Sequence, residues 1–179
     1  STSKSAKRLV KMGEDKMKIF NYGAMCNDSI NQLKKLSKAK VENLLGTKFS
    51  KRNILISYHP ETYSKKKNIN DLKILFRSLY GIDNTKFIFS APNFDENSHV
   101  TLKMIKEFCR KNKNALYIDS LGHELFLNTL RFTDILLGNS SSGIIEAGLM
   151  KKYSINLGKR QLGRERTSFV VDCQFNSKI

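Results

Sequence analysis

The chain has 179 residues, of which 40% are hydrophobic and 27% are charged, and this is the composition of a globular protein rather than a disordered one. The length suffices for one domain with a sizeable core but not for two large ones. No run of about 18 apolar residues occurs, so no membrane-spanning helix is expected. The polar segment Ser1–Arg8 has no apolar stretch behind it, so no secretory signal is expected either.

Apolar, β-rich runs alternate along the chain with longer segments of helical periodicity. In chain order the expected elements are a helix at Ser5–Met12, a strand at Met17–Tyr22, helices at Ser29–Leu36 and Val41–Leu45, a strand at Asn53–Tyr58, a helix at Leu72–Tyr80, a strand at Lys86–Ser90, a helix at Val100–Lys111, a strand at Ala115–Ile118, a helix at Glu124–Leu130, a strand at Asp134–Leu137, a helix at Gly143–Leu149, and strands at Tyr153–Leu157 and Ser168–Val171. Short strands separated by helices predict βαβ units, and strands that are apolar on both faces predict a parallel sheet covered on both sides. We therefore expect one doubly wound, Rossmann-like α/β domain over residues 1–179.

The net charge is +16, from 32 Lys and Arg against 16 Asp and Glu. Such a charge favours a polyanion, a phosphate-bearing ligand or an acidic partner domain. Most of the lysines are scattered, however, and only Lys65–Lys67 forms a tight run, in an expected loop. A solvated lysine-rich surface is the simpler interpretation. With no ribbon of alternating aromatic and basic residues, nucleic acid is not the expected partner.

The cysteines Cys26, Cys109 and Cys173 are odd in number and widely spaced. This usage fits the reducing cytoplasm better than a disulfide framework, and the spacing is not that of zinc ligands. We expect a cytoplasmic protein without a metal site.

Ligands of open α/β sheets bind beyond the carboxyl ends of the strands. Five loops follow predicted strands and hold most of the polar chemistry: residues 59–62, 91–95, 119–122, 138–143 and 158–161.

The loop Gly138–Gly143 reads GNSSSG and is expected to leave a strand and open a helix. Free backbone N–H groups, the hydroxyls of Ser140 and Ser141 and the helix dipole would then point at one site, which suits a phosphate. The alternative is an ordinary serine N-cap, although three serines exceed what a cap requires. Glu146, a turn or less into that helix, could accept hydrogen bonds from a ribose diol or be a surface glutamate.

Two further loops carry candidate binding groups. His59 directly follows the strand NILISY, where it could be an acid, a base or a phosphate donor, or have a structural role. Arg160 and Arg164 follow another strand and could hold a diphosphate, or belong to a solvated basic loop. No catalytic triad or carboxylate pair is visible, so the chain carries only part of the equipment of an enzyme.

Several loops in this order resemble those of the hydrolysing UDP-N-acetylglucosamine 2-epimerases of sialic acid and related nonulosonic acid pathways. The matching stretches are GED…IFNYGAMCNDSI, SYHPET, FSAPNFDENS, the Asp119–Leu121 stretch, GNSSSGIIEAG and INLGKRQLGRER. The resemblance runs from about Lys7 to Val171, almost the whole chain.

The resemblance implies a GT-B architecture, in which two Rossmann-like domains enclose the nucleotide sugar. This chain would be the C-terminal domain, with the N-terminal domain absent and the full-length enzyme a homodimer. UDP-binding residues are expected at His59, Asn93, Leu121, Ser140, Ser141, Glu146 and Arg160. The two serines and Arg160 would hold the diphosphate, Glu146 the ribose hydroxyls, and main chain near Leu121 the uracil. Asn93 would line the cleft, and His59 would be the catalytic candidate beside the departing UDP oxygen.

The implied reaction removes the C2 proton of UDP-N-acetylglucosamine and eliminates UDP, after which water adds to give N-acetylmannosamine. The acid–base carboxylates belong to the family's N-terminal domain, so this chain alone would be inactive. No cofactor is expected, only the UDP-sugar substrate. Three alternatives stay open: a 2-epimerase acting on a UDP-2,4-diacetamido-trideoxy sugar, a GT-B glycosyltransferase, and a non-catalytic nucleotide- or RNA-binding module.

Overall fold

The computed structural model describes residues 2–61, 65–93 and 98–175, and the chain divides into two units, Ser1–Leu33 and Lys34–Ile179. All strands of the described chain lie in the larger unit. The expectation of one domain over residues 1–179 stays a prediction. No helix within the described ranges is both long enough and apolar enough to cross a bilayer.

The smaller unit contains α1 (Ser3–Lys11), a 3₁₀ turn η1 (Lys16–Lys18) and α2 (Cys26–Asn31). The prediction of a strand at Met17–Tyr22 is wrong, since this segment forms η1 followed by irregular chain. A strand needs a neighbour for its peptide groups, and within this unit no other strand is described. The predicted helix at Ser29–Leu36 is shorter and earlier, because α2 ends at Asn31.

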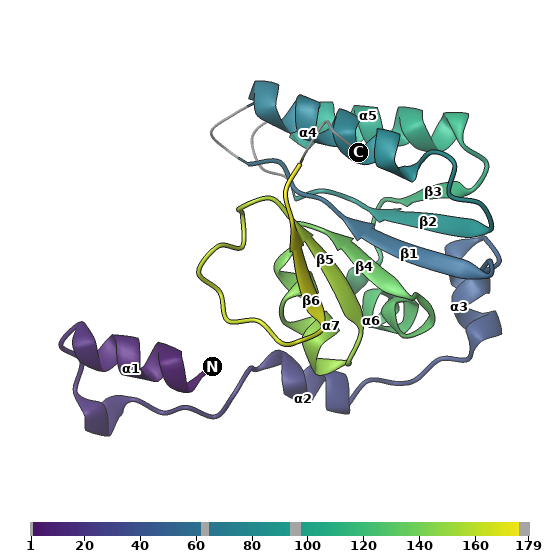
Figure 1. The fold of residues 1–179 in the computed structure, drawn as a ribbon. Coiled ribbons are helices and arrows are strands. Elements are labelled where there is room, and N and C mark those ends of the chain that lie inside the picture. The colour runs from purple at the N-terminus through teal and green to yellow at the C-terminus, as the bar shows by residue number, and fades with distance from the viewer. Residues whose placement is uncertain (1, 62–64, 94–97, 176–179) are drawn as a thin grey trace. The chain divides into compact units, whose positions relative to one another are not determined.

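The larger unit is built on a six-stranded sheet in the order β3-β2-β1-β4-β5-β6 (Figure 1). The strands are β1 (Arg52–Ser57), β2 (Thr85–Ser90), β3 (Ala115–Ile118), β4 (Ile135–Gly138), β5 (Tyr153–Leu157) and β6 (Val170–Cys173). Every neighbouring pair is parallel. The chain builds outward from β1 to β3 and then returns to the other side of β1 with β4. This confirms the predicted doubly wound, Rossmann-like fold, with its switch point between β1 and β4.

Helices cover both faces of the sheet (Figure 1). The bounds are Lys65–Leu79 for α4 and Ser98–Lys111 for α5 on one face, and Lys38–Leu45 for α3, Gly122–Phe132 for α6 and Glu146–Leu149 for α7 on the other. Successive side chains of β1 alternate between the two resulting cores. Ile56 packs in the core with α4 and α5, and Leu55 packs in the core with α3 and α6. Both are fully buried, which is worth about 1.5–3 kcal/mol each.

Two predictions about local structure near the site were wrong, one for Lys65–Lys67 and one for Gly143–Leu149. The Lys65–Lys67 run lies in the first turn of α4 rather than in a loop, where Lys67 pairs with Asp71 one turn later. The helix expected at Gly143–Leu149 is split into a 3₁₀ turn η2 (Ser141–Gly143) and the short α7. The turn lies against β5, since a Cβ on Gly143 would come within 2.7 Å of Ser154 Oγ.

Gly138 is the last residue of β4 and pairs with Ser57 at the end of β1. Its φ is +145°, and a Cβ there would lie 2.0 Å from the carbonyl oxygen of Ser57. We expect Gly138→Ala to destabilise the protein by at least about 3 kcal/mol, because a backbone atom cannot move aside as a flexible side chain could. Urea unfolding measures the change.

Gly46→Ala is the matched control for this substitution. Gly46 also has a positive φ, +67°, but nothing lies within 4 Å of the added Cβ. The control should cost only about 1 kcal/mol, the price of the left-handed conformation alone. Equal losses for the two variants would contradict the steric argument.

Candidate functional site

A pocket of about 460 Å³ lies beyond the carboxyl ends of the strands, around the switch point. It is lined by the loops that follow β1, β2, β3 and β4 and by Arg160 after β5. The predicted residues all line this pocket: His59, Asn93, Leu121, Ser140, Ser141, Glu146 and Arg160. The structure thus brings them together, while their individual roles stay predictions. Residue 62 and residues 94–95 of the candidate loops lie outside the described residues.

Several lining residues escaped the sequence analysis. His123 belongs to the first turn of α6 and borders the pocket, although it is exposed. Phe126 also lines the pocket, one helical turn after Gly122, and that spacing was the signal that could have revealed it. Arg164, expected beside Arg160, is not among the residues that line the pocket.

The serine turn is tighter than expected. Ser140 caps η2, and its hydroxyl accepts from the Ser142 N–H at 3.3 Å and donates to Ser142 Oγ at 3.2 Å. Ser140 therefore does serve as a cap, while Ser141 and Ser142 also face the pocket. Because α7 has only four residues, the predicted dipole of a long helix does not contribute here. Binding of an anion would depend on the hydroxyls, the turn N–H groups and Arg160.

Arg160 is oriented by the loop that follows β4. Its Nη1 donates to the carbonyl oxygen of Asn139 at 3.2 Å, and Gln161 Nε2 donates to the same oxygen at 2.9 Å. One carbonyl thus draws the loop after β5 towards the serine turn. The guanidinium retains further N–H donors for a ligand.

His59 is buried, with 7% of its surface exposed. Its Nδ1 accepts a hydrogen bond from the Asn93 main-chain N–H at 3.0 Å, and its Nε2 lies 3.3 Å from Ser57 Oγ. An N–H aimed at Nδ1 requires a lone pair there, so the neutral ring carries its proton on Nε2. In this tautomer the Nε2–H is the donor and Ser57 Oγ the acceptor of the contact between the two residues, both of which line the pocket.

Glu146 holds a carboxylate oxygen, Oε2, that is buried and has no hydrogen-bond partner within the described structure. A buried charged oxygen without a donor is costly, and native proteins keep few such groups. Since the residue lines the pocket, a ligand hydroxyl is the donor that this arrangement suits. The side chain is partly buried, unlike the surface glutamate that the sequence left open.

The pocket is electrostatically polarised by the order of the strands. Asp119 follows β3 and Arg160 follows β5, and these strands lie on opposite sides of the switch point. A hydrogen bond of 2.8 Å from the Tyr117 hydroxyl, together with Lys106 at 3.5 Å, holds the pKa of Asp119 below its ordinary value. A carboxylate thus borders one end of the pocket and a guanidinium the other. A phosphate would be placed at the serine and arginine end.

Comparison with known proteins shows the family of the chain. The profile of the family UDP-N-acetylglucosamine 2-epimerase matches residues 1–179. The chain belongs to this family.

Individual relatives are similar over nearly the whole chain. It is 35% identical over 95% of its length to the GDP/UDP-N,N'-diacetylbacillosamine 2-epimerase (hydrolyzing) of Campylobacter jejuni. It is 33% identical over 96% of its length to the UDP-N,N'-diacetylbacillosamine 2-epimerase (hydrolyzing) of Legionella pneumophila. The chain spans less than half of these relatives, 44% and 45% of their lengths.

Solved structures share the fold of this epimerase-family chain. The UDP-GlcNAc 2-epimerase of Methanocaldococcus jannaschii, in complex with UDP-GlcNAc and UDP, has a TM-score of 0.70 at 20% identity. The match covers 95% of this chain and 48% of that one.

The orphaned oxygen of Glu146 leads to a stability prediction. We expect Glu146→Gln to raise the free energy of unfolding of the ligand-free protein by about 1 kcal/mol, because the buried oxygen Oε2, which has no hydrogen-bond partner in the described structure, then carries no charge. Urea unfolding measures it. Glu124→Gln, an exposed glutamate in the first turn of α6, is the control and should change stability by no more than about 0.5 kcal/mol. A loss of stability in Glu146→Gln would show that the carboxylate has a compensating partner.

Proposed function

We propose that this chain is the UDP-binding half of a hydrolysing UDP-sugar 2-epimerase. The observation that carries the proposal is that the residues predicted from separate loops line one pocket at the switch point. Membership of the family and the UDP and UDP-GlcNAc bound by the Methanocaldococcus enzyme support the choice of ligand. Fold alone would not, since this fold serves many functions.

In the proposed complex the nucleotide spans the pocket according to its polarity. Ser140, Ser141 and Arg160 hold the diphosphate, and the unpartnered oxygen of Glu146 accepts from the ribose hydroxyls. Uracil then lies at the other end, against main chain near Leu121. A base can approach a carboxylate such as Asp119 at lower cost than a phosphate can.

His59 acts on the departing group. With its proton on Nε2, the neutral ring donates a hydrogen bond to the phosphate oxygen that becomes negative as the bond from sugar C1 to UDP breaks. Asn93 lines the cleft and holds the ring through its main-chain N–H. Loss of the C2 proton and of UDP yields a 2-acetamidoglucal, and addition of water releases the 2-epimeric sugar.

In this complex the two carboxylates that line the pocket have other roles, since Glu146 accepts from the ribose and Asp119 lies at the uracil end, so the proton transfers at C2 need further groups. We assign them to an N-terminal half corresponding to the portion of the relatives that this chain does not match. The unit Ser1–Leu33 supports such a partner, because it exposes large apolar side chains, which monomeric surfaces seldom gather. These are Met12, Met17, Phe20, Tyr22 and Met25. The assembled enzyme would be a homodimer in the cytoplasm, inactive without that half.

The first test is binding of UDP, with ADP as the competing nucleotide, followed by calorimetry or NMR. Half of a cleft should bind UDP at about millimolar affinity, equivalent to about 4 kcal/mol, and ADP more weakly. Arg160→Ala should weaken UDP by about tenfold or more, since charge-assisted bonds are lost. Ser141→Ala should weaken it by about twofold to fivefold.

Arg164→Ala is the matched control, because Arg164 is an arginine of the same loop that does not line the pocket. It should leave UDP affinity unchanged. Equal binding of UDP and ADP with no effect of Arg160→Ala would refute the assignment. Strongly salt-dependent RNA binding would then favour the alternative of a basic binding module.

Two UDP-sugars are candidates for the substrate. UDP-N-acetylglucosamine is the substrate that the family description names, whereas the diacetylbacillosamine enzymes are more similar to this chain than the 26% identical UDP-N-acetylglucosamine 2-epimerase of Neisseria meningitidis. The higher identity favours a UDP-2,4-diacetamido sugar. We expect an enzyme containing this chain to release UDP faster from that sugar when both are supplied at equal concentration. Faster release from UDP-N-acetylglucosamine would reverse the choice, and transfer only to an added acceptor would reveal a glycosyltransferase.

A further inference from the structure

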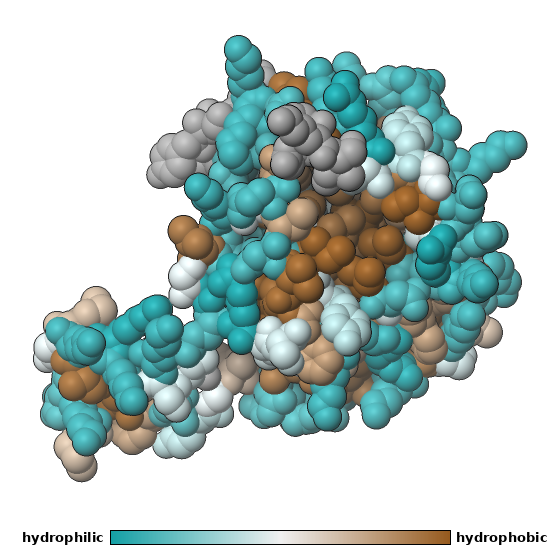
Figure 2. All heavy atoms as spheres, in the orientation of Figure 1, coloured by the Kyte–Doolittle hydropathy of each residue, from teal (hydrophilic) through white to brown (hydrophobic). Residues whose placement is uncertain are grey.

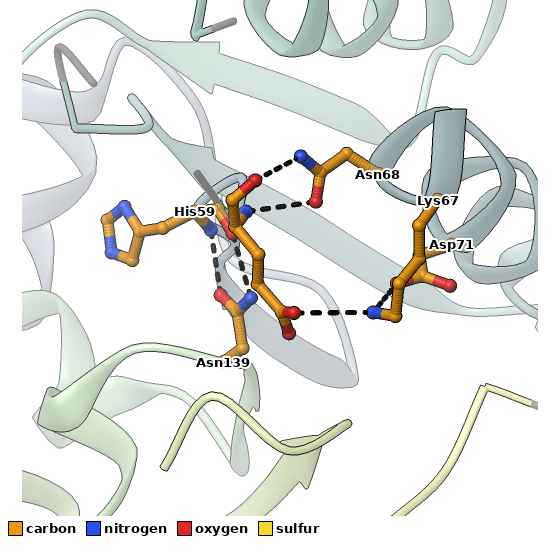
Figure 3. A network of polar contacts seen from close by, with 6 residues as sticks. His59, Lys67, Asn68, Asp71 and Asn139 are labelled. Atoms are coloured by element: carbon orange, nitrogen blue, oxygen red, sulfur yellow. Dashed lines mark hydrogen bonds and ion pairs between the residues drawn. The ribbon is translucent and has the colours of Figure 1, made fainter. Parts of the chain in front are cut away.

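Beyond the end of β1 the chain continues as His59–Glu61, and its peptide groups are paired by side chains instead of strands. The His59 N–H donates to Asn139 Oδ1 at 2.7 Å, and Asn139 Nδ2 donates back to the His59 carbonyl at 2.8 Å (Figure 3). The amide of Asn139 thereby behaves like one peptide unit of a neighbouring strand.

A second asparagine, Asn68, makes the same pair of hydrogen bonds on the C-terminal side of Pro60. The Glu61 N–H donates to Asn68 Oδ1 at 2.9 Å, and Asn68 Nδ2 donates to the Glu61 carbonyl at 2.7 Å (Figure 3). Pro60, between the two, has no N–H to satisfy. Both asparagines are nearly fully buried, with 1% of Asn139 and 2% of Asn68 exposed. Only a primary amide offers both a donor and an acceptor in this way.

Asn139 and Asn68, which pair with the main chain of His59 and Glu61, belong to different parts of the fold. Asn139 follows β4, and its own N–H donates to the Ser57 carbonyl at 3.2 Å, which continues the β1–β4 ladder. Asn68 belongs to α4. Beside it, Lys67 Nζ lies 3.5 Å from Glu61 Oε2 and 2.7 Å from Asp71 Oδ2, so the same helix also holds the Glu61 side chain.

We infer that Asn68 and Asn139 are positioning residues for His59. By fixing the backbone on both sides of Pro60, they set the ring where Nδ1 meets the Asn93 N–H and Nε2 faces Ser57. The tautomer, and therefore the donor offered to the pocket, depends on that placement. Asn68 does not line the pocket, so its effect on a ligand must pass through the chain that carries His59. The part that concerns the ligand rests on the proposed function.

The test is Asn68→Asp in the whole chain. Aspartate has nearly the same shape but lacks the Nδ2 donor, and it would oppose an oxygen to the Glu61 carbonyl. In ligand-free protein, long-range ¹H–¹⁵N spectra of the imidazole, assigned by loss of signals in His59→Gln, should change from the Nε2–H tautomer to a mixture. UDP affinity should fall by about threefold to tenfold, the equivalent of one hydrogen bond.

Asn128→Asp is the matched control. Asn128 is also buried and pairs with main chain in the same way, accepting from the Leu36 N–H at 2.9 Å and donating to the Lys34 carbonyl at 3.0 Å. It does not line the pocket. In this variant, whose aspartate would still accept from Arg131 Nη1, the His59 spectrum and UDP affinity should stay as in the unmodified protein.

Should Asn68→Asp fail to fold, Asn68→Ser removes the double pairing without adding charge and should produce the same change at His59. An unchanged His59 spectrum in a folded Asn68 variant would overturn the inference and leave the asparagine with a structural role only. A changed His59 spectrum in a chain that, unmodified, binds no UDP would uphold the positioning role and refute the proposed function instead.

Discussion

The contact between β1 and β4 is the constraint on which the site depends. In a doubly wound sheet the connections after these two strands leave in opposite directions, and the space between them becomes the pocket. Here Gly138 pairs with Ser57, and its positive φ leaves no room for a Cβ beside the Ser57 carbonyl. Asn139 extends the pairing past the last residue of each strand. Loops that would otherwise be separate are thereby held at the distance that one ligand can bridge.

The net charge of the chain does not describe the charge distribution in the pocket, which depends on a few side chains. Most of the excess lysine is scattered along the sequence, and Figure 2 shows hydrophilic residues surrounding a hydrophobic area at the centre of the visible face of the larger unit. Specificity would come from a few fixed groups instead. Arg160 is held by a carbonyl, His59 by an N–H and Asp119 by a phenol, and each partner restrains a side chain that would be mobile in water. Preorganised polar groups of this kind cost little further reorganisation when a ligand arrives.

Several polar atoms in and near the site lack partners in the described structure, among them Glu146 Oε2 and Gln161 Oε1. The Gln161 amide is half satisfied, since its Nε2 donates to Asn139. Such atoms reduce stability where they lie, and a binding site is a place where proteins tolerate that cost. The core on either side of β1, by contrast, is built from buried apolar side chains.

The sequence by itself determined the fold class and the set of binding loops. Apolar runs such as NILISY and KFIFS can be buried only between two layers of helices, and parallel strands bring their following loops to one edge, so His59, Ser141 and Arg160 could be placed together in advance. The sequence did not determine where tertiary contacts override the local preference for a strand or a helix. The run IFNY is strand-like, yet without a partner it does not pair, and the helix expected at Gly143 becomes a 3₁₀ turn against Ser154. Only the tertiary structure decided the roles of Asn68 and Asn139, since an asparagine's partners here lie up to 80 residues away. Such pairing depends on which loops the folded sheet places side by side, and a pattern of neighbouring residues does not contain it.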